Sequence, residues 1–154
     1  IGFKSISFDK SLCKEPVEAG SGKISVLLVE PNKYPKMIEI DDTLEAMQAV
    51  VGGDIEEYMP FEDEVAIICN EEGKVNGLTP NRAVYDEHSR EMQDVICGKF
   101  FIVYAPFEAE KFQSLPPDLA EKYREKFKYP ERFMRVNNEI VAVPFKPVRA
   151  DKER

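Results

Sequence analysis

The sequence has a single histidine and only three cysteines in 154 residues. A structural zinc site usually takes closely spaced Cys or His ligands, and the sequence has no CxxC motif, so we predict no metal site. Cys13, Cys69 and Cys97 are odd in number and far apart, which disfavours a disulfide framework. Cys69 and Cys97 lie in apolar runs, where a free thiol behaves as a small buried hydrophobe.

Long apolar runs are also missing. The longest, FFIVYAPF at residues 100–107, is far too short to cross a bilayer. The chain begins with Ile1 and lacks the pattern of a secretory signal, so we interpret it as a trimmed product or an excised module and expect a cytoplasmic location. A chain of this length buries enough surface to fold without disulfides or metals, and its composition is typical of a globular protein.

Positive charge is scarce in most of the chain. Residues 1–110 contain 10 Lys and Arg against 22 Asp and Glu, whereas residues 111–154 contain 11 against 7. Binding to a nucleic acid backbone requires a basic surface that displaces counterions, so the acidic bulk disfavours a DNA or RNA binder. Only the basic C-terminal segment favours nucleic acid binding, and its charges are also explained by a solvated helix of mixed charge.

Catalytic signatures are equally scarce. His88 is the only side chain whose unperturbed pKa lies near neutrality, and it stands among acids in the stretch DEHS. The sequence has no serine or cysteine in a nucleophile-elbow context and no glycine-rich phosphate loop. We therefore predict that the chain is not an enzyme and that it needs no cofactor.

Apolar runs alternate with turn signals from residue 23 onward. The runs KISVLLVE and KMIEI, on either side of PNKYP, predict a strand pair. The apolar residues of LEAMQAVV fall on one face of a helix, which Asp42 or Thr43 can cap and which Gly52 and Gly53 can end in the left-handed conformation. The runs IEEYMPF, EVAIIC and VICGKFFIVYA predict further strands.

The C-terminal part predicts another helix and a hairpin. Pro116 and Pro117 stand at the first turn of DLAEKYREKF, where their missing amide donors cost nothing. In RFMRVNNEIVAVPF, the pair Asn137 and Asn138 can adopt the left-handed turn geometry between two strands. These elements together predict a single α+β domain, with two or three helices packed on a mostly antiparallel sheet.

The first residues differ from the rest of the chain. A short alternating pattern in IGFKSISF gives way to charged residues, proline and a Gly-Ser-Gly triplet, which is typical of a connector. We therefore assign residues 1–22 to an N-terminal extension or linker, residues 23–148 to the α+β domain, and residues 149–154 to a C-terminal tail.

Several of these segments together resemble a known family. The strand LLVEP, the helix TLEAMQAVVGG, the loop NEEGKVNGLTPNR and the strand DVICGKFFI are similar, in this order and spacing, to a bacterial and phage family of unknown function. The resemblance covers Lys23 to Tyr104, and EKYREKFKYPERF and EIVAVPFKP look like the longer members of that family. It implies a phage, plasmid or conjugative element as the source, in some cases with the domain as a module of a large polyvalent protein. It implies no reaction, cofactor or catalytic residue.

The loop between the runs EVAIIC and DVICGKFFIVY is one candidate binding site. Turn chemistry explains most of it, with a β-turn at NEEGK and a short helical turn starting at TPN. Turn chemistry does not explain Arg82. Its guanidinium can bind an anion through two parallel hydrogen bonds, or it can form a salt bridge with Glu71, Glu72, Asp86 or Glu87 that fixes the loop. One hypothesis is therefore a pocket for a nucleotide or another small anion, lined by Asn70, Asn76, Asn81 and Arg82.

The acidic run DIEEYMPFEDE is the second candidate site. It has neither the spacing of an EF-hand nor a D-x-D cluster beside a histidine, so we predict a solvated negative edge rather than a cation site. Such an edge attracts a basic protein groove. The hypothesis that we rank first is a non-catalytic interaction module of a mobile element. It binds a host or element protein, for example a defence enzyme, through Asp54, Glu56, Glu57, Glu62, Asp63 and Glu64. The sequence predicts no membrane partner and leaves the oligomeric state open.

Overall fold

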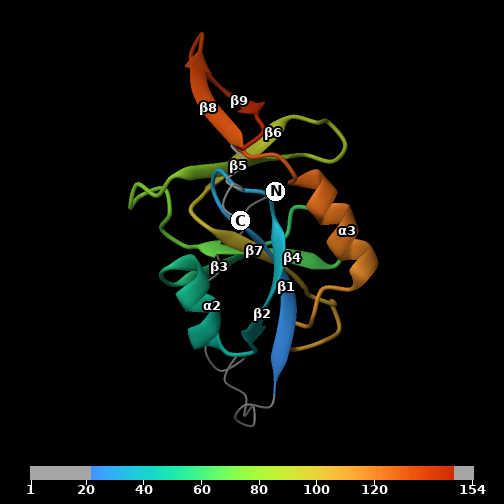
Figure 1. Ribbon diagram of the computed structural model, residues 1–154. Helices are drawn as coiled ribbons and strands as arrows, with labels where there is room; N and C mark the ends of the chain where they lie inside the picture. The colour runs from blue at the N-terminus through green and yellow to red at the C-terminus, as the bar shows by residue number, and fades with distance from the viewer. Residues whose placement is uncertain (1–21, 148–154) are drawn as a thin grey trace.

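The computed structural model describes residues 22–147 (Figure 1). The predicted extension at residues 1–22, except for Gly22, lies outside this part, as do Cys13 and the predicted tail at residues 149–154. The elements follow one another as β1 (Lys23–Val29), β2 (Lys36–Asp41), α2 (Leu44–Val51), β3 (Ile55–Tyr58), β4 (Val65–Asn70), β5 (Pro80–Tyr85), β6 (Met92–Cys97), β7 (Phe100–Tyr104), α3 (Pro117–Lys126), β8 (Glu131–Val136) and β9 (Glu139–Pro144).

The prediction of an α+β domain with two or three packed helices is wrong. The described residues form nine strands in three antiparallel sheets and only two short helices, which make up 14% of the structure. Two misread segments explain part of this error. The predicted helical turn at TPN is the start of strand β5, and Gly98, with φ of 90°, splits the single run VICGKFFIVYA into β6 and β7. These two strands belong to different sheets.

The centre of the molecule is a five-stranded antiparallel sheet with the strand order β2-β1-β7-β4-β3. The predicted pair β1 and β2 is confirmed, with Leu27 opposite Met37. In the middle of the sheet, Ile102 of β7 lies between Leu27 of β1 and Ile67 of β4. Both faces of this sheet are covered, which explains why these three strands appear in the sequence as continuous apolar runs rather than alternating patterns.

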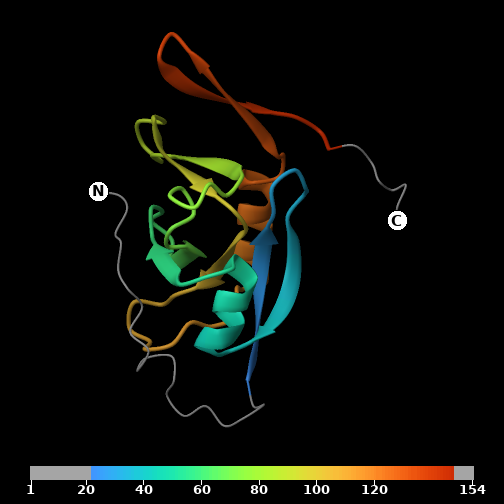
Figure 2. The ribbon, with the colours of Figure 1, turned by 90° about the vertical axis from the view of Figure 1, so that its left-hand side faces the viewer.

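Each face of the central sheet has its own apolar core. Helix α2 covers one face, and helix α3 together with the ribbon β5–β6 covers the other (Figures 1 and 2). The core under α2 includes Val26, Leu44, Met47, Val51, Ile68, Phe101 and Val103. The core under α3 includes Leu27, Tyr58, Ile67, Val84, Ile96, Phe100, Ile102, Tyr123 and Phe127.

The ends of helix α2 agree with the predicted capping in part. The hydroxyl of Thr43, and not a side chain of Asp42, accepts a hydrogen bond of 3.1 Å from the amide of Ala46. Gly52 has the left-handed conformation, with φ of 81°, so it ends the helix as expected. Gly53 has no positive φ; a side chain there would instead place Cβ 2.9 Å from the amide nitrogen of Asn70.

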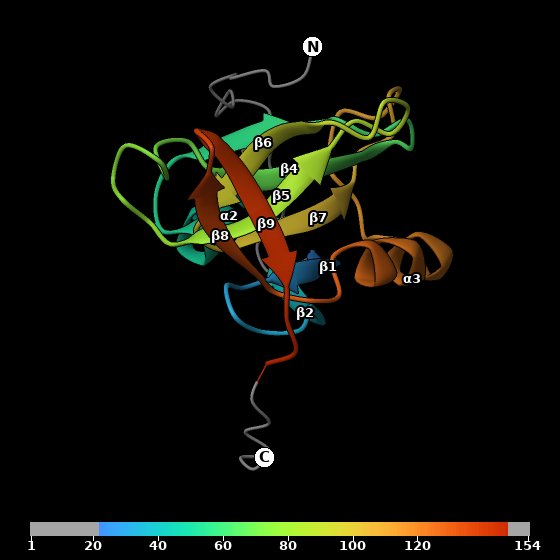
Figure 3. The same ribbon diagram turned by 90° about the horizontal axis from the view of Figure 1, so that it is seen from above.

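Helix α3 and the C-terminal hairpin are confirmed. Pro116 is the N-cap of α3 and Pro117 is its first residue. Strands β8 and β9 pair around Asn137 and Asn138, which both have positive φ, as the sequence predicts. This hairpin extends from the body of the molecule (Figure 2), and in the view from above it lies nearest the viewer (Figure 3). Neither helix of the described residues has the length and apolarity needed to cross a membrane.

Candidate functional site

Arg82 lies inside the protein and not in a surface loop. Its side chain is fully buried in strand β5. Nε donates to the carbonyl oxygen of Phe127 at 3.0 Å, Nη2 to that of Lys33 at 2.8 Å, and Nη1 to the side-chain oxygen of Asn81 at 2.8 Å. Within the described residues its hydrogen-bond partners are therefore carbonyl oxygens, and the predicted salt bridge to an acidic neighbour in the loop is not formed.

The position of Arg82 makes it a structural link. Phe127 ends helix α3, where the carbonyl oxygens carry the negative end of the helix dipole, and Lys33 belongs to the turn between β1 and β2. Burial lowers the pKa of the Arg82 guanidinium to about 10, an effect that the nearby Glu131 carboxylate opposes. The guanidinium thus keeps its charge at neutral pH and joins three separate parts of the chain.

The three asparagines of the hypothetical anion pocket do not converge with Arg82 on one pocket. Asn81 is buried, and its amide donates to the carbonyl oxygens of Val29 and Gly98 at 3.0 and 2.9 Å. Asn70 donates to the carbonyl oxygen of Val51 at the end of α2. Asn76 is exposed in the connection between β4 and β5. Two of these asparagines therefore bond to different parts of the backbone, and the third lies at the surface.

The acidic run does not form a single edge either. Glu56 and Glu57 are neighbours in β3, so their side chains point to opposite faces of the sheet. Glu56 is buried, and the prediction that it is solvated is wrong. Glu57 is half-buried and lines a cavity on the α2 side. Strand geometry alone thus separates these two carboxylates.

The remaining carboxylates of the run make contacts within the domain. Asp63 accepts hydrogen bonds from Lys122 at 2.6 Å and from the hydroxyl of Tyr123 at 2.7 Å, so helix α3 supplies the base that the run itself lacks. These bonds hold the pKa of Asp63 below its usual value. The other contacts are Glu62 with the ring of His88, Glu64 with the amide of Phe107, and Asp54 with the side chain of Gln48.

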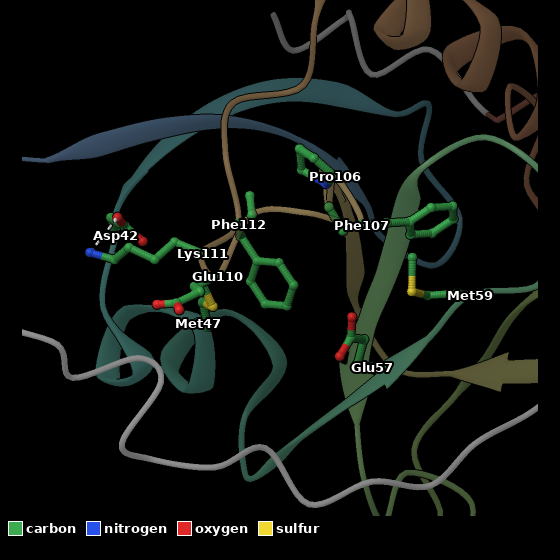
Figure 4. Close-up of a pocket in the computed structure, with 11 residues that line it drawn as sticks. Asp42, Met47, Glu57, Met59, Pro106, Phe107, Glu110, Lys111 and Phe112 are labelled. Atoms are coloured by element: carbon green, nitrogen blue, oxygen red, sulfur yellow. Dashed lines mark ion pairs between the residues drawn. The ribbon is translucent and has the colours of Figure 1, made fainter.

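A cavity of about 380 Å³ lies beside helix α2, between that helix, strand β3 and the segment that follows β7 (Figure 4). We call it the α2 cavity. In Figure 4 the Phe112 ring lies near the centre, with Met47 and Glu110 to one side and Met59 and Phe107 to the other. Its lining consists of Asp42, Met47, Glu57, Met59, Ala105, Pro106, Phe107, Ala109, Glu110, Lys111 and Phe112.

The wall formed by residues 105–112 is held at both ends. Tyr104 and Gln113 exchange two backbone hydrogen bonds of 3.1 and 2.9 Å, which close the base of this segment. The amide of Phe107 donates to the carboxylate of Glu64 at 3.0 Å, and the amide of Ala105 donates to the carbonyl oxygen of the same residue at 2.8 Å. These bonds fix the two phenylalanines of the wall relative to β4.

Among the described residues that line the α2 cavity, the charged groups are mostly acidic. They are the carboxylates of Asp42, Glu57 and Glu110 and the ammonium group of Lys111. The Lys111 nitrogen lies 3.8 Å from a carboxylate oxygen of Asp42. Burial raises the pKa of Asp42, and Lys111 offsets only part of that rise. A cation that enters the cavity would therefore meet a carboxylate that is incompletely compensated.

The reactive groups that the described residues bring to the cavity are three carboxylates and one amine, and none of its described lining residues is a histidine, cysteine, serine or threonine. No group of three His, Cys, Asp or Glu side chains in residues 22–147 is arranged to hold a metal ion. Two methionines and two phenylalanines add an adaptable apolar surface to the lining. The arrangement fits an apolar stem that ends in a positive charge.

Of the predicted site residues, only Glu57 lies at this cavity. The sequence analysis did not identify Met59, Phe107 or Phe112 as functional residues. A sequence signal was present, because the segment FEAEKF carries two phenylalanines after the apolar run that forms β7. The structure shows that this segment has no regular secondary structure and that Phe107 is 69% exposed. Large apolar residues in such a connection are candidates for binding.

A family model for a domain of unknown function, DUF3846, matches residues 24–128, well over half of the chain. The match includes both helices and every residue of the α2 cavity, and it ends before the hairpin β8–β9. No curated protein and no solved structure matches the chain. Membership in a family of unknown function is thus confirmed, over a longer span than the Lys23–Tyr104 of the prediction. The chain belongs to the DUF3846 family.

Proposed function

We propose that the domain is a non-catalytic protein-interaction module, in which the α2 cavity receives a lysine or arginine side chain of a protein partner. The observation that carries this proposal is that one cavity is lined both by apolar side chains, including Met47, Met59 and Phe112, and by carboxylates. Lys and Arg have long apolar stems that bury against such surfaces while the charged head reaches polar groups. The cavity offers both environments in its lining.

The electrostatics favour a cationic occupant over a neutral one. Asp42 is partly desolvated, which raises its pKa, and a second positive charge beside it would stabilise the ionised form. Glu57 and Glu110 add two further carboxylates at the same cavity. The overall negative charge of the chain, −8, also attracts a basic partner over a longer range.

The proposal includes a biological setting. The module is carried by a phage, plasmid or conjugative element and acts in the cytoplasm on a protein of the host or of the element, a defence enzyme being one candidate. The resemblance of the VLLVEP, TLEAMQ and NEEGK segments to proteins of such elements supports this setting. The buried free thiol of Cys69 is consistent with a reducing compartment.

The alternative, a pocket for a small anion in the Asn70–Arg82 segment, has less support. Asn81 and Arg82 are buried, and their donors are engaged with carbonyl oxygens of the domain. An anion would have to displace these bonds. We therefore favour the α2 cavity.

Methionine methyl NMR tests the proposal directly. The chain has five methionines, of which Met47 and Met59 line the cavity and Met134 lies on the distant hairpin. The probes are blocked pentapeptides of glycine and serine with a central Arg, Lys, norleucine or Glu. We expect the Arg and Lys peptides to shift the Met47 and Met59 signals with dissociation constants on the order of 1 mM, because only one side chain is anchored. Met134 should not move.

Matched variants separate recognition of the positive charge from non-specific binding. The double change Glu57→Gln and Glu110→Gln should weaken Arg-peptide binding by roughly tenfold, since it removes two of three carboxylates. The control is Glu121→Gln, which removes the same kind of charge from the exposed surface of α3, the helix that covers the opposite face of the sheet. Equal shifts with the Glu peptide, or no shift of Met47 and Met59 with any peptide, would contradict the proposal.

A further inference from the structure

In the part of the chain that the structure describes, one face of the hairpin β8–β9 is exposed, with Arg132 at its base lying over the Phe145 ring, 4.4 Å from the ring centroid. Cross-strand pairs place the side chains of Arg132, Met134 and Val136 on the same face as those of Val143, Val141 and Glu139. We call this the outer face. All six residues are exposed, with exposed fractions of 48% for Met134, 46% for Val136, 36% for Val141 and 40% for Val143. A strip of four apolar side chains is therefore in contact with solvent along the ribbon.

The opposite face of the same hairpin meets the domain. Glu131, Phe133 and Ala142 belong to this inner face and are half-buried. The carboxylate of Glu131 accepts a hydrogen bond of 2.8 Å from the amide of Ala83 in β5. The packing of the inner face thus explains Phe133 and Ala142 but not Ile140, which is 46% exposed near the tip, and it gives no reason for the apolar residues of the outer face.

An isolated two-stranded hairpin is only marginally stable in water, and it needs a further layer to bury an apolar face. Single exposed apolar residues are ordinary, whereas four in a row on one face indicate contact with another surface. The hairpin also lies beyond the span of the family match, which ends at residue 128. A role for this face is therefore separate from that of the α2 cavity.

The charges of the outer face are complementary to themselves. Arg132 lies at the base of the hairpin beside Val143, and Glu139 lies at its tip beside Val136. When two such faces pack with opposite directions around a two-fold axis, the base of each hairpin lies over the tip of the other, so Arg132 of each copy lies opposite Val136 of the other and diagonally next to its Glu139. The central pair Met134 and Val141 then packs against the same pair of the second copy. An interface of this kind is isologous, which is the commonest arrangement in homodimers.

We propose that the outer face of the hairpin β8–β9 is a homodimer interface, formed with a second copy of this chain in the antiparallel arrangement. The hairpin projects from the body of the domain (Figures 1 and 2). Six residues of strand span about 20 Å, and a two-stranded ribbon is only roughly 10 Å wide. The face therefore covers roughly 200 Å² per copy, well below the roughly 800 Å² per partner of a standard specific interface, so the dimer is weak and depends on concentration.

Sedimentation velocity of the full chain, from about 10 µM to about 1 mM, measures this association. Val141→Asp should weaken the dimer by at least about tenfold, because it places a charge at the centre of the interface. Ile140→Asp is the matched control. Ile140 is the neighbour of Val141 in sequence and is 46% exposed, but its side chain belongs to the inner face, so this change should leave the dissociation constant within about twofold. Circular dichroism and thermal unfolding check that both variants fold.

Charge exchange tests the antiparallel arrangement. Arg132→Glu and Glu139→Lys should each weaken self-association, because each creates two like-charge contacts across the two-fold axis. An equimolar mixture of the two single variants should associate as the unchanged chain does, since every contact between them joins opposite charges. A chain that stays monomeric throughout the range, a Val141→Asp variant that dimerises normally, or a mixture that fails to recover would each overturn the proposal.

Discussion

Replacing Arg82 by methionine should destabilise the domain substantially. Methionine keeps an apolar stem of similar length but removes all the N–H donors. Three acceptors lose hydrogen bonds of 2.8 to 3.0 Å: the carbonyl oxygens of Phe127 and Lys33 and the side-chain oxygen of Asn81. Leaving a buried acceptor without a partner costs about 1–3 kcal/mol, so the gross loss is roughly 3–9 kcal/mol.

The net loss is smaller than this sum. Burying a guanidinium costs several kcal/mol even in a good site, and the methionine variant no longer bears that cost. We therefore expect the free energy of unfolding to fall by about 3 kcal/mol, at the lower end of the range for breaking a buried charged network. Arg82→Lys should recover only part of it, because one ammonium group cannot reach acceptors on α3, β5 and the β1–β2 turn together.

Urea unfolding followed by circular dichroism measures the effect, with the midpoint and the slope fitted separately for each variant. Arg135→Met is the control, because Arg135 is exposed on the hairpin and the same substitution there should change stability by less than about 0.5 kcal/mol. An Arg82→Met protein as stable as the unchanged chain would refute the structural role and would return Arg82 to the anion-binding hypothesis.

Three further predictions concern other parts of the domain. Gly53→Ala should cost about 1–2 kcal/mol through the contact with Asn70, and in thermal unfolding of a double-mutant cycle most of this cost should disappear in an Asn70→Ala background. Asp63 has a lowered pKa in the folded protein, so its contribution to stability is present above its unfolded pKa of about 3.9 and is lost as the pH falls through the folded value. Asp63→Asn should therefore flatten the acid limb of a stability curve between about pH 5 and pH 2; an unchanged limb would show that its bonds to α3 contribute nothing. Burial raises the pKa of Cys69 to about 12, and it raises that of Cys97 as well. In the native protein at about pH 8, iodoacetamide should modify Cys97 slowly and Cys69 more slowly still, as mass spectrometry of peptides would show; faster labelling of Cys69 would contradict its burial.

The sequence was informative wherever structure depends on near neighbours. Helix α2 has its cap at Thr43 and its left-handed end at Gly52, and the hairpin turns at Asn137 and Asn138. These features follow from bonds and φ preferences within a few residues, so composition and spacing are enough to predict them. The same reasoning missed strand β5, because its flanking turn residues are equally compatible with one long loop.

Only the tertiary structure decided the positions of the charged residues. Alternation along β3 puts Glu56 and Glu57 on opposite faces of the sheet, and the packing of the assembled domain then buries Glu56. The α2 cavity combines residues 42, 47, 57 and 59 with residues 105–112, which no local pattern connects.

For this protein, the sequence by itself determined the helix ends, the hairpin, most strands and membership in its family. The sequence did not determine whether Arg82 is buried, because two of the carbonyl oxygens that accept its hydrogen bonds belong to residues 45 and 49 positions away. The same arginine would be a solvated surface group if those segments lay elsewhere. Burial and hydrogen bonding are properties of the assembled fold, so the structure alone could move Arg82 from a candidate binding loop to the interior of the domain.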